Sequence, residues 1–283
     1  MTKHTLITGT QGYVGNQLSK YLESKSYNVD KLSVRNDAWQ SIGFSKYEVI
    51  IHLAAIVNNN EPNADMKRYM DINYKITKQL ADKAKAEGVK QFIFFSTMAV
   101  FGLEGKVGEN EVITKETILN PKTEYGISKL KADQYLTSIQ DDSFVVSIIR
   151  PPMIYGKDAP GNFTKLKKYA EYIPFYLNIK NERSAIYIEN LEKCIFDIIV
   201  KRMPGIYYPT DKDSFKTNEV IKTIRQINNK RSFGIPVPKS LYPALRKVSL
   251  LNKLYGNLTY DKSMQYNDTE QFSDLASSLR KSI

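Results

Sequence analysis

Tyr125 and Lys129 are four residues apart in a stretch whose pattern predicts a helix over residues 123–139. In a helix this spacing places both side chains on one face, one turn apart. A tyrosine hydroxyl has a pKa of about 10, and a nearby ammonium lowers that pKa because it favours the phenolate. At ~4 Å and an effective dielectric of ~20, the attraction is about 4 kcal/mol. The pair therefore predicts a tyrosine that transfers protons near neutral pH, the alternative being an ordinary exposed helix surface.

A glycine-rich turn near the N-terminus predicts a binding site for a dinucleotide. A short apolar strand pattern ends directly before Gly9, and an amphipathic helix pattern begins at Val14. In this context Gly9 permits a tight turn, Gly12 lets the backbone approach a pyrophosphate, and Gly15 lets helix and strand pack closely. The N–H groups around Tyr13 and Val14 would then face the phosphates. The alternative is a glycine-rich turn without a ligand.

The end of the second predicted strand, residues 29–34, indicates which dinucleotide is bound. An acidic residue at this place commonly accepts hydrogen bonds from the ribose hydroxyls of NAD. Here the chain has Ser33, followed by Arg35 two residues later. A hydroxyl and a guanidinium suit a 2′-phosphate. The sequence therefore favours NADP(H) over NAD(H), unless Arg35 is simply a solvated loop charge.

Further strand patterns end in residues that could line the same site. They cover residues 48–55, 91–95 and 144–149, and the carboxyl ends of parallel strands meet at one edge of the sheet. The residues expected there are Leu53, Ala54, Ala55, Ser96, Thr97, Pro151 and Met153. His52 is predicted to be a packed strand residue, and residues 58–60 a polar loop at this edge.

The order of the patterns predicts an α/β protein with a doubly wound Rossmann sheet of parallel strands. A long helix over residues 66–87 contains Asn73 and stops at Gly88. After Gly156 the regular alternation ends, and a smaller, mixed C-terminal lobe follows. In it, residues 162–172 and 189–201 read as helices, residues 185–188 as a strand, and Thr217 as the cap of another helix.

We expect the two domains to be interleaved along the chain. Residues 1–155, with about 184–205, form the predicted cofactor domain, and residues 156–183 with 206–283 form the substrate lobe. The 283 residues are 42% hydrophobic and 25% charged, which is typical of a soluble globular protein. One cysteine, Cys194, and two histidines exclude a disulfide and a metal cluster. No signal peptide or transmembrane pattern is present, so we expect a cytoplasmic protein.

The net charge of +11 suits an anionic partner such as a nucleotide. No nucleic-acid-binding motif is present, so a nucleic acid is not expected. Residues 239–258 alternate basic and apolar residues. They are predicted to form helices of the substrate lobe, with weak contact to a membrane surface as the second interpretation.

These motifs together resemble the extended short-chain dehydrogenases/reductases, and within them the NAD-dependent epimerase/dehydratase family. The glycine turn has that family's form, and His52-Leu53-Ala54-Ala55 is similar to its usual third-strand ending. Residues 96–102, 150–156 and 183–191 are similar to three further family motifs. Ser184 departs from the pattern, because the family usually has an acidic residue there.

The resemblance implies a catalytic trio. Thr97 would bind the substrate oxygen, Tyr125 would exchange a proton with it, and Lys129 would hold the nicotinamide ribose. Pro151 and Met153 would border the nicotinamide, and Asn73 would lie in the cofactor site. The substrate residues implied by the resemblance are Ser96, Thr97, Thr123, Asn162 and Arg183.

More closely, the chain resembles the C4-keto reductases of bacterial capsular and O-antigen synthesis, with residues 252–261 similar to a motif near their C-terminus. The resemblance implies reduction of a UDP-2-acetamido-2,6-dideoxy-4-hexulose by NADPH, in a homodimer. The product would be UDP-N-acetylfucosamine or UDP-N-acetylquinovosamine. A nucleotide-sugar 4-epimerase that retains NAD is the first alternative, and a non-catalytic NADP-binding regulator is the second.

Overall fold

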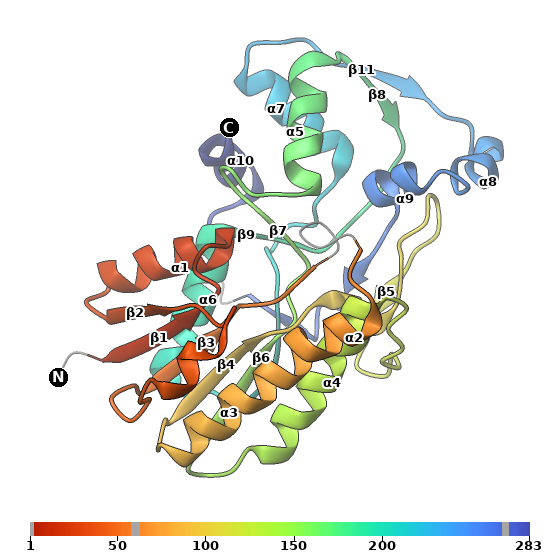
Figure 1. Ribbon diagram of the computed structural model, residues 1–283. Coiled ribbons are helices and arrows are strands. Elements are labelled where there is room, and N and C mark those ends of the chain that lie inside the picture. Colours follow the sequence, from red (N-terminus) through yellow and green to blue (C-terminus); the bar gives the residue numbers. More distant parts are fainter. Residues whose placement is uncertain (1–2, 58–62, 268–271) are drawn as a thin grey trace. The chain divides into compact units, whose positions relative to one another are not determined.

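The computed structural model describes residues 3–57, 63–267 and 272–283. The chain forms two compact units, each built from several segments (Figure 1). Unit 1 consists of Met1–Gly102, Ile118–Pro151 and Glu192–Tyr207, and unit 2 of Leu103–Thr117, Pro152–Leu191 and Tyr208–Ile283. The predicted loop at residues 58–60 lies outside the described residues.

The main sheet is parallel throughout and has the strand order β13-β10-β6-β4-β3-β1-β2. Its strands are β1 (His4–Thr8), β2 (Asn28–Leu32), β3 (Val49–His52), β4 (Gln91–Phe95), β6 (Val145–Ile149), β10 (Gly205–Pro209) and β13 (Gln265–Tyr266). β2 and β3 lie on opposite sides of β1, so the strand order reverses at β1. Ligands of such sheets bind at the carboxyl ends of the strands at this reversal. The predicted Rossmann-type fold is confirmed.

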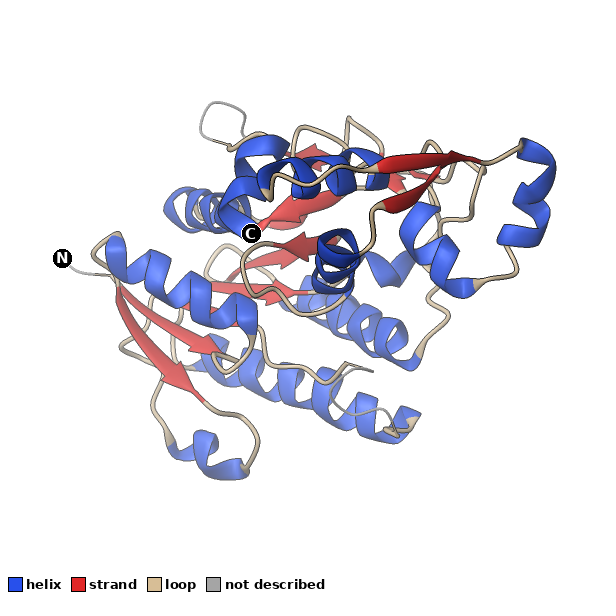
Figure 2. Ribbon diagram, turned by 90° about the horizontal axis from the view of Figure 1, so that it is seen from above, coloured by secondary structure: helices blue, strands red, loops and turns tan. Residues whose placement is uncertain are grey.

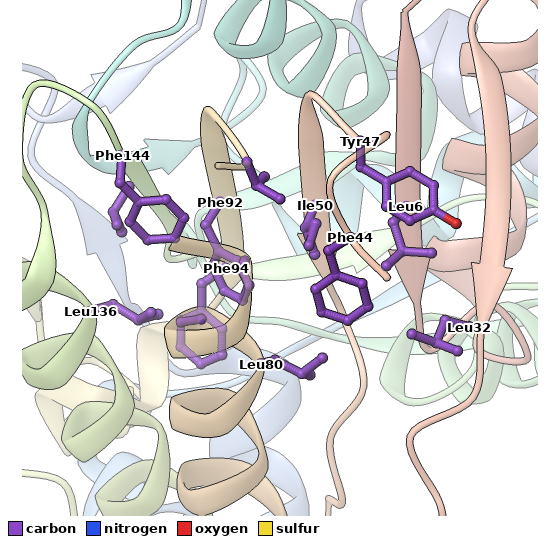
Figure 3. Packing of buried hydrophobic residues seen from close by; sticks show 14 of the residues in the cluster. Leu6, Leu32, Phe44, Tyr47, Ile50, Leu80, Phe92, Phe94, Leu136 and Phe144 are labelled. Carbon is purple, nitrogen blue, oxygen red and sulfur yellow. The ribbon is translucent and has the colours of Figure 1, made fainter. Parts of the chain in front are cut away.

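Helices cover both faces of the unit 1 sheet (Figures 1 and 2). α1 packs beside α6, where the rings of Tyr21 and Phe196 have centroids 6.0 Å apart. α3 packs beside α4 on the other face. Buried side chains of the sheet and of α3 and α4 form the core in Figure 3, among them Leu6, Ile50, Leu80, Phe92, Phe94, Leu136 and Phe144. The helices are α1 (Tyr13–Ser24), α2 (Met66–Tyr69), α3 (Thr77–Ala86), α4 (Glu124–Ile139) and α6 (Ile188–Lys201).

The helix predicted over residues 66–87 is helical in the structure, but it is not a uniform α-helix. A π-helical segment, Met70–Ile76, separates α2 from α3. Single π turns often occur at functional sites because they redirect side chains. Here the segment contains the buried Asn73, whose amide binds groups outside its own helix. Gly88 has φ +81°, as expected for a glycine that ends a helix.

Unit 2 has short strand pairs and a separate core. β7 pairs with β9, β8 with β11, and β12 with β5, all in parallel. Aromatic rings of Tyr155, Phe163, Tyr187 and Phe215 pack together in its interior. The strands are β5 (Val112–Ile113), β7 (Met153–Tyr155), β8 (Phe175–Asn178), β9 (Ala185–Tyr187), β11 (Phe233–Pro236) and β12 (Thr259–Tyr260). The helices are α5 (Asn162–Tyr172), α7 (Thr217–Ile227), α8 (Tyr242–Leu245), α9 (Ser249–Tyr255) and α10 (Leu275–Ser282).

The helices of unit 2 bear on two predictions, the helix cap at Thr217 and the structure of residues 239–258. Thr217 is not the cap of α7: it is the first helical residue, Lys216 precedes it, and its hydroxyl donates to the Leu254 carbonyl instead. The basic residues 239–258 form a 3₁₀ turn and the short α8 and α9 rather than one amphipathic helix. Across the described ranges, every helix is too short or too polar to cross a bilayer.

Candidate active site

The turn between β1 and α1 has the geometry that its glycines predict. Gly9 has φ +77°, and a Cβ on it would lie 2.6 Å from the Ala54 nitrogen. A Cβ on Gly15 would lie 2.6 Å from the Gly9 oxygen, to which Gly12 N–H donates at 3.0 Å. Any side chain at Gly9 or Gly15 would therefore separate β1, β3 and α1.

The start of α1 offers backbone donors to an anion. Helix α1 begins at Tyr13, and Gly12 before it has no side chain to cap the first turn. The first N–H groups of a helix lack partners within the helix, and together with its dipole they bind phosphate. The turn therefore fits a dinucleotide, with Gly9, Gly12, Tyr13, Val14 and Gly15 around the pyrophosphate.

Beyond β2, Ser33 and Arg35 are both exposed, whereas Val34 between them is buried. The Ser33 hydroxyl accepts a hydrogen bond from the Arg35 backbone N–H at 3.5 Å. The two side chains thus stand on the solvent side of this strand end, and neither is acidic. Together they offer a hydroxyl and a guanidinium to a ligand.

A chain of buried hydrogen bonds runs from β1 through β3 to α3. His52 is fully buried, and burial, assisted by the charge of Lys129, lowers its pKa to about 3, so the ring is neutral. The Thr77 hydroxyl donates to the Asn73 carbonyl at 2.8 Å, so it must accept from Nε2 of His52 at 2.9 Å. Nδ1 of His52 then accepts from the Thr8 hydroxyl at 2.7 Å. His52 is a packed strand residue, as predicted, and the network defines its tautomer.

Asn73 extends this network to the helix of Tyr125. Its Oδ1 accepts from the Ile56 N–H at 2.8 Å, and its Nδ2 donates to the Ile56 carbonyl at 3.0 Å and to the Ser128 hydroxyl at 3.1 Å. The Ser128 hydroxyl donates to the Tyr125 carbonyl at 2.9 Å. The amide of Asn73, expected to contact a cofactor, therefore joins the segment after β3 to α4.

Thr97 and Tyr125 come together from separate segments. Thr97 follows β4 and caps the 3₁₀ turn Met98–Phe101, where its hydroxyl accepts from the Ala99 N–H at 3.1 Å. Tyr125 is half-buried in the first turn of α4. Burial raises the pKa of Tyr125 to about 12, although the Thr97 side chain acts to lower it. Tyr125 therefore holds its proton at neutral pH.

This result corrects the predicted effect of Lys129. The expected ammonium at ~4 Å would lower the pKa of Tyr125, but burial raises it instead. Lys129 is 1% exposed, donates to the Phe95 carbonyl at 2.7 Å and lies 4.4 Å from the centre of the Phe94 ring. Burial lowers the pKa of Lys129 to about 7, while Asp133 acts to raise it.

Sequence reasoning missed Asp133, one turn beyond Lys129 on α4. Asp133 is 2% exposed, and its Oδ2 accepts from the Ser96 hydroxyl at 2.9 Å and from Nε of Arg150 at 3.0 Å. Burial raises the pKa of Asp133 to about 6, against the lowering effect of Arg150. The spacing of Tyr125, Lys129 and Asp133, at i, i+4 and i+8, was a signal for this residue.

The remaining predicted residues take other positions. The Pro151 carbonyl accepts from the Met98 N–H at 3.1 Å, so Pro151 adjoins the turn after Thr97. Thr123 caps α4, where its Oγ1 accepts from the Gly126 N–H at 3.1 Å. Met153 lies in β7 of unit 2, opposite Ala185. Leu53, Ala54 and Ala55 follow β3 directly and are half-buried.

Comparison with known proteins places the chain in a family. Residues 5–195 match the model of the NAD dependent epimerase/dehydratase family. The chain belongs to this family. Its members include NAD(P)-dependent epimerases, dehydratases and reductases of the extended short-chain type. The resemblance of the sequence motifs is thereby confirmed at the level of the family.

Several known proteins are similar over most of their length. A UDP-glucose 4-epimerase of Vibrio cholerae is 29% identical over 292 residues, covering 93% of this chain and 88% of that protein. A UDP-glucuronic acid 4-epimerase from Bacillus cereus, solved with NAD, has a TM-score of 0.71 at 17% identity, covering 98% and 94%. RMD from Pseudomonas aeruginosa, solved with NADPH, has a TM-score of 0.72 at 19% identity, covering 99% and 96%. The two solved structures share the fold.

The turn after Thr97 and the position of Ser184 can now be described. Met98 and Ala99 occupy the 3₁₀ turn after Thr97. Neither side chain can move a proton. Ser184 is buried in unit 2, where its hydroxyl accepts from the Tyr260 N–H at 2.9 Å. An acidic side chain at position 184 would therefore be buried beside the Tyr260 N–H.

The two predicted substrate residues of unit 2, Asn162 and Arg183, differ in exposure and in hydrogen bonding. Asn162 is exposed at the first turn of α5. Arg183 is half-buried, and its Nη1 donates to the carbonyls of Gly256 at 2.8 Å and Asn252 at 3.3 Å. Burial lowers the pKa of Arg183 from its ordinary value. Within the described ranges, no group of His, Cys, Asp and Glu side chains could hold a metal ion.

Proposed function

We propose that this chain reduces the C4 ketone of a UDP-2-acetamido-2,6-dideoxy-4-hexulose with NADPH. The product is UDP-N-acetylfucosamine or UDP-N-acetylquinovosamine, used in the cytoplasm for surface polysaccharide synthesis. The observation that carries the proposal is the placement of Thr97 directly after β4 and of Tyr125 in the first turn of α4, in a chain of the epimerase/dehydratase family. A reductase needs a proton donor at the ketone oxygen, and a tyrosine with a raised pKa retains that proton at neutral pH.

The roles of the site residues follow from their chemistry. Thr97 binds the ketone oxygen, and Tyr125 delivers its proton to the incipient alkoxide. Bound NADPH supplies the hydride. Lys129 holds the nicotinamide ribose and, when charged, stabilises negative charge that develops nearby. Asp133 is a positioning residue that favours the charged form of Lys129.

Unit 1 is the proposed cofactor-binding unit. Ser33 and Arg35 bind the 2′-phosphate of NADP, because a guanidinium is always charged and offers several donors to phosphate oxygens. Pro151 and the residues after β3 border the nicotinamide and adenosine parts. NAD(H) is the second choice of cofactor. Unit 2 is proposed to bind the UDP-sugar, with Asn162 and Arg183 near its diphosphate.

The decisive experiment incubates the purified chain with NADPH and a UDP-4-keto-6-deoxy sugar made by a 4,6-dehydratase. We expect loss of absorbance at 340 nm, with roughly one NADPH consumed per ketone, since each hydride comes from the cofactor. The dehydratase product without the chain is the control. No consumption of NADPH above that control would contradict the proposal.

A 4-epimerase is the second candidate, and the similarity to the Vibrio cholerae UDP-glucose 4-epimerase favours it. An epimerase returns the hydride to the sugar, so UDP-GlcNAc and UDP-GalNAc would interconvert without consumption of cofactor. The absence of an acidic pair after Thr97 disfavours dehydration but not epimerisation. We also propose a homodimer formed through the α2–α3 and α4 helices.

A further inference from the structure

Unit 2 exposes apolar side chains on one face of a two-stranded sheet. β8 and β11 are paired in parallel, with Phe175 opposite Phe233 and the two ring centroids 5.8 Å apart. Phe175, Phe233 and Ile235 are 49%, 51% and 46% exposed. Tyr176, which points to the opposite face, is buried. Parallel strands are usually covered on both faces, so this open face requires an explanation.

Residues 239–255 form a 3₁₀ turn, α8 and α9, and these elements lie near β8 and β11 (Figure 1). Their inward side chains, including Leu245 and Leu254, pack on a buried cluster around Tyr255, and Leu177 of β8 packs on the same cluster. The outward side chains of the segment are instead exposed: Leu241 51%, Val248 46% and Leu250 59%. Leu177 lies on the same face of the sheet as Phe175, because side chains two residues apart in a strand share a face. The cluster therefore joins this face of the sheet to the segment 239–255.

The same region is strongly basic. Residues 220–260 contain eight Lys and Arg and no Asp or Glu, so they account for eight of the net eleven positive charges of the chain. Arg225 is buried and Arg246 is paired with Glu109 at 3.0 Å. The other six are exposed: Lys222, Lys230, Arg231, Lys239, Lys247 and Lys253. Lys222 lies over the Tyr176 ring, 5.7 Å from its centre, on the opposite face of the two strands. We therefore call the other five, with the six exposed apolar residues above, the basic apolar surface.

The positive charge and the apolar side chains of this surface together indicate which kind of partner it binds. A second copy docked through the same surface would bring like charges together, because a two-fold interface is self-complementary. A nucleic acid would use the basic and aromatic side chains but would have no use for the exposed Ile, Val and Leu residues. An anionic bilayer satisfies both classes: its headgroups attract Lys and Arg, and its interface takes up aliphatic and aromatic side chains.

We propose that the basic apolar surface binds anionic phospholipid bilayers peripherally. Phe233, Ile235 and Leu250 enter the interface between headgroups and acyl chains, while Lys239 and Lys247 lie among the headgroups. Binding of this kind weakens with rising salt, because headgroup attraction is screened within a Debye length. This inference is independent of the reaction proposed for unit 1.

The test is flotation of the full chain with phosphatidylcholine vesicles and with vesicles rich in phosphatidylglycerol. We expect binding to the anionic vesicles alone. The double variant Lys239→Gln/Lys247→Gln should bind about thirtyfold more weakly, since each charge contributes ~1 kcal/mol and 1.4 kcal/mol is tenfold. Phe233→Ser/Leu250→Ser should also lose binding. The matched controls, Lys20→Gln/Lys90→Gln and Ile118→Ser, change exposed residues of unit 1 and should change binding by less than about twofold.

Three results would overturn the inference. One is equal binding of the wild type to neutral and anionic vesicles, or to neither. Another is loss of binding in the unit 1 controls as large as in the surface variants, which would indicate attraction by net charge only. The third is displacement of the chain from vesicles by single-stranded DNA at equal charge concentration, which would favour a nucleic acid. A thermal unfolding midpoint within about 2 °C of wild type shows that each variant is folded.

Discussion

The predicted site residues are joined by hydrogen bonds in unit 1 but are not brought together in unit 2. In unit 1, residues from five segments are joined by hydrogen bonds: the ends of β1, β3 and β4, the π segment and α4. In unit 2, Asn162 is exposed, and Arg183 donates to backbone carbonyls of its own unit. Parallel strands bring their carboxyl ends to one edge, so a regular sheet concentrates the residues that follow its strands. Most strands described in unit 2 form separate two-stranded pairs, and its motif residues are not gathered in this way.

The largest expected effect is the fall in kcat on replacing Tyr125, which tests the proposed proton donor of unit 1. Tyr125→Phe removes the proton donor and keeps the ring, so kcat should fall by about 10²–10⁴-fold, with little change in cofactor affinity. The matched control is Tyr135→Phe on the same helix, which should keep its activity. Cofactor affinity is measured by fluorescence titration and turnover at 340 nm. A variant with nearly wild-type turnover would show that Tyr125 is not the acid.

His52→Leu tests whether the network of unit 1 supports the fold. The change removes the acceptor of the buried Thr8 hydroxyl, at about 1–3 kcal/mol, while the Thr77 hydroxyl keeps its bond to the Asn73 carbonyl. The free energy of unfolding should therefore fall by ~1–3 kcal/mol. His4→Leu is the control, because His4 makes one exposed contact of 3.4 Å, and should cost less than about 0.5 kcal/mol. Urea unfolding measures both. Equal losses would mean that the network contributes nothing specific.

Arg35→Ala tests the cofactor preference. A charge-assisted hydrogen bond to a phosphate contributes about 1.5–3 kcal/mol, so the ratio of kcat/KM for NADPH to that for NADH should fall roughly ten- to a hundredfold. Lys31→Ala, which removes an exposed charge within β2, is the control. A wild type that uses both cofactors equally would refute the proposed phosphate contact.

The pH dependence of reduction tests Lys129. Its pKa is lowered to about 7, so Lys129 is charged below pH 7 and neutral above it. If the charged form assists reduction, kcat/KM is constant below about 7 and falls about tenfold per pH unit above it. Asp133 raises the pKa of Lys129, so Asp133→Asn should move the break to lower pH. A break that does not move would leave Asp133 without this role.

The smallest effect on activity is expected for a substitution at Asn162 in unit 2. Asn162→Ala removes an exposed side chain, so the free energy of unfolding should change by less than about 0.5 kcal/mol. Loss of one hydrogen bond to the sugar nucleotide should raise KM by about two- to tenfold, with kcat unchanged. Asn228→Ala at the end of α7 is the control. An unchanged KM would remove Asn162 from the proposed substrate site and sharpen the contrast between the units.

Local sequence determined the parts of this protein that depend on backbone period and conformation. The glycine turn follows from Gly9 and Gly15, where any Cβ would collide with backbone atoms. The helix at Tyr125 begins beside Thr123, whose side chain caps it, and the apolar strand Gln91–Phe95 was predicted from its residues alone. Such features need only neighbouring residues, so a pattern reveals them.

Only the tertiary structure decided the electrostatics and the partners. Spacing alone predicted a lowered pKa for Tyr125, but burial raises it, because the cost of desolvating the phenolate exceeds the lowering effect of Thr97. Lys129 turns to the Phe95 carbonyl, and Asp133 meets Ser96 and Arg150, which are distant in the chain. These contacts depend on how strands and helices pack, and no local pattern contains that information.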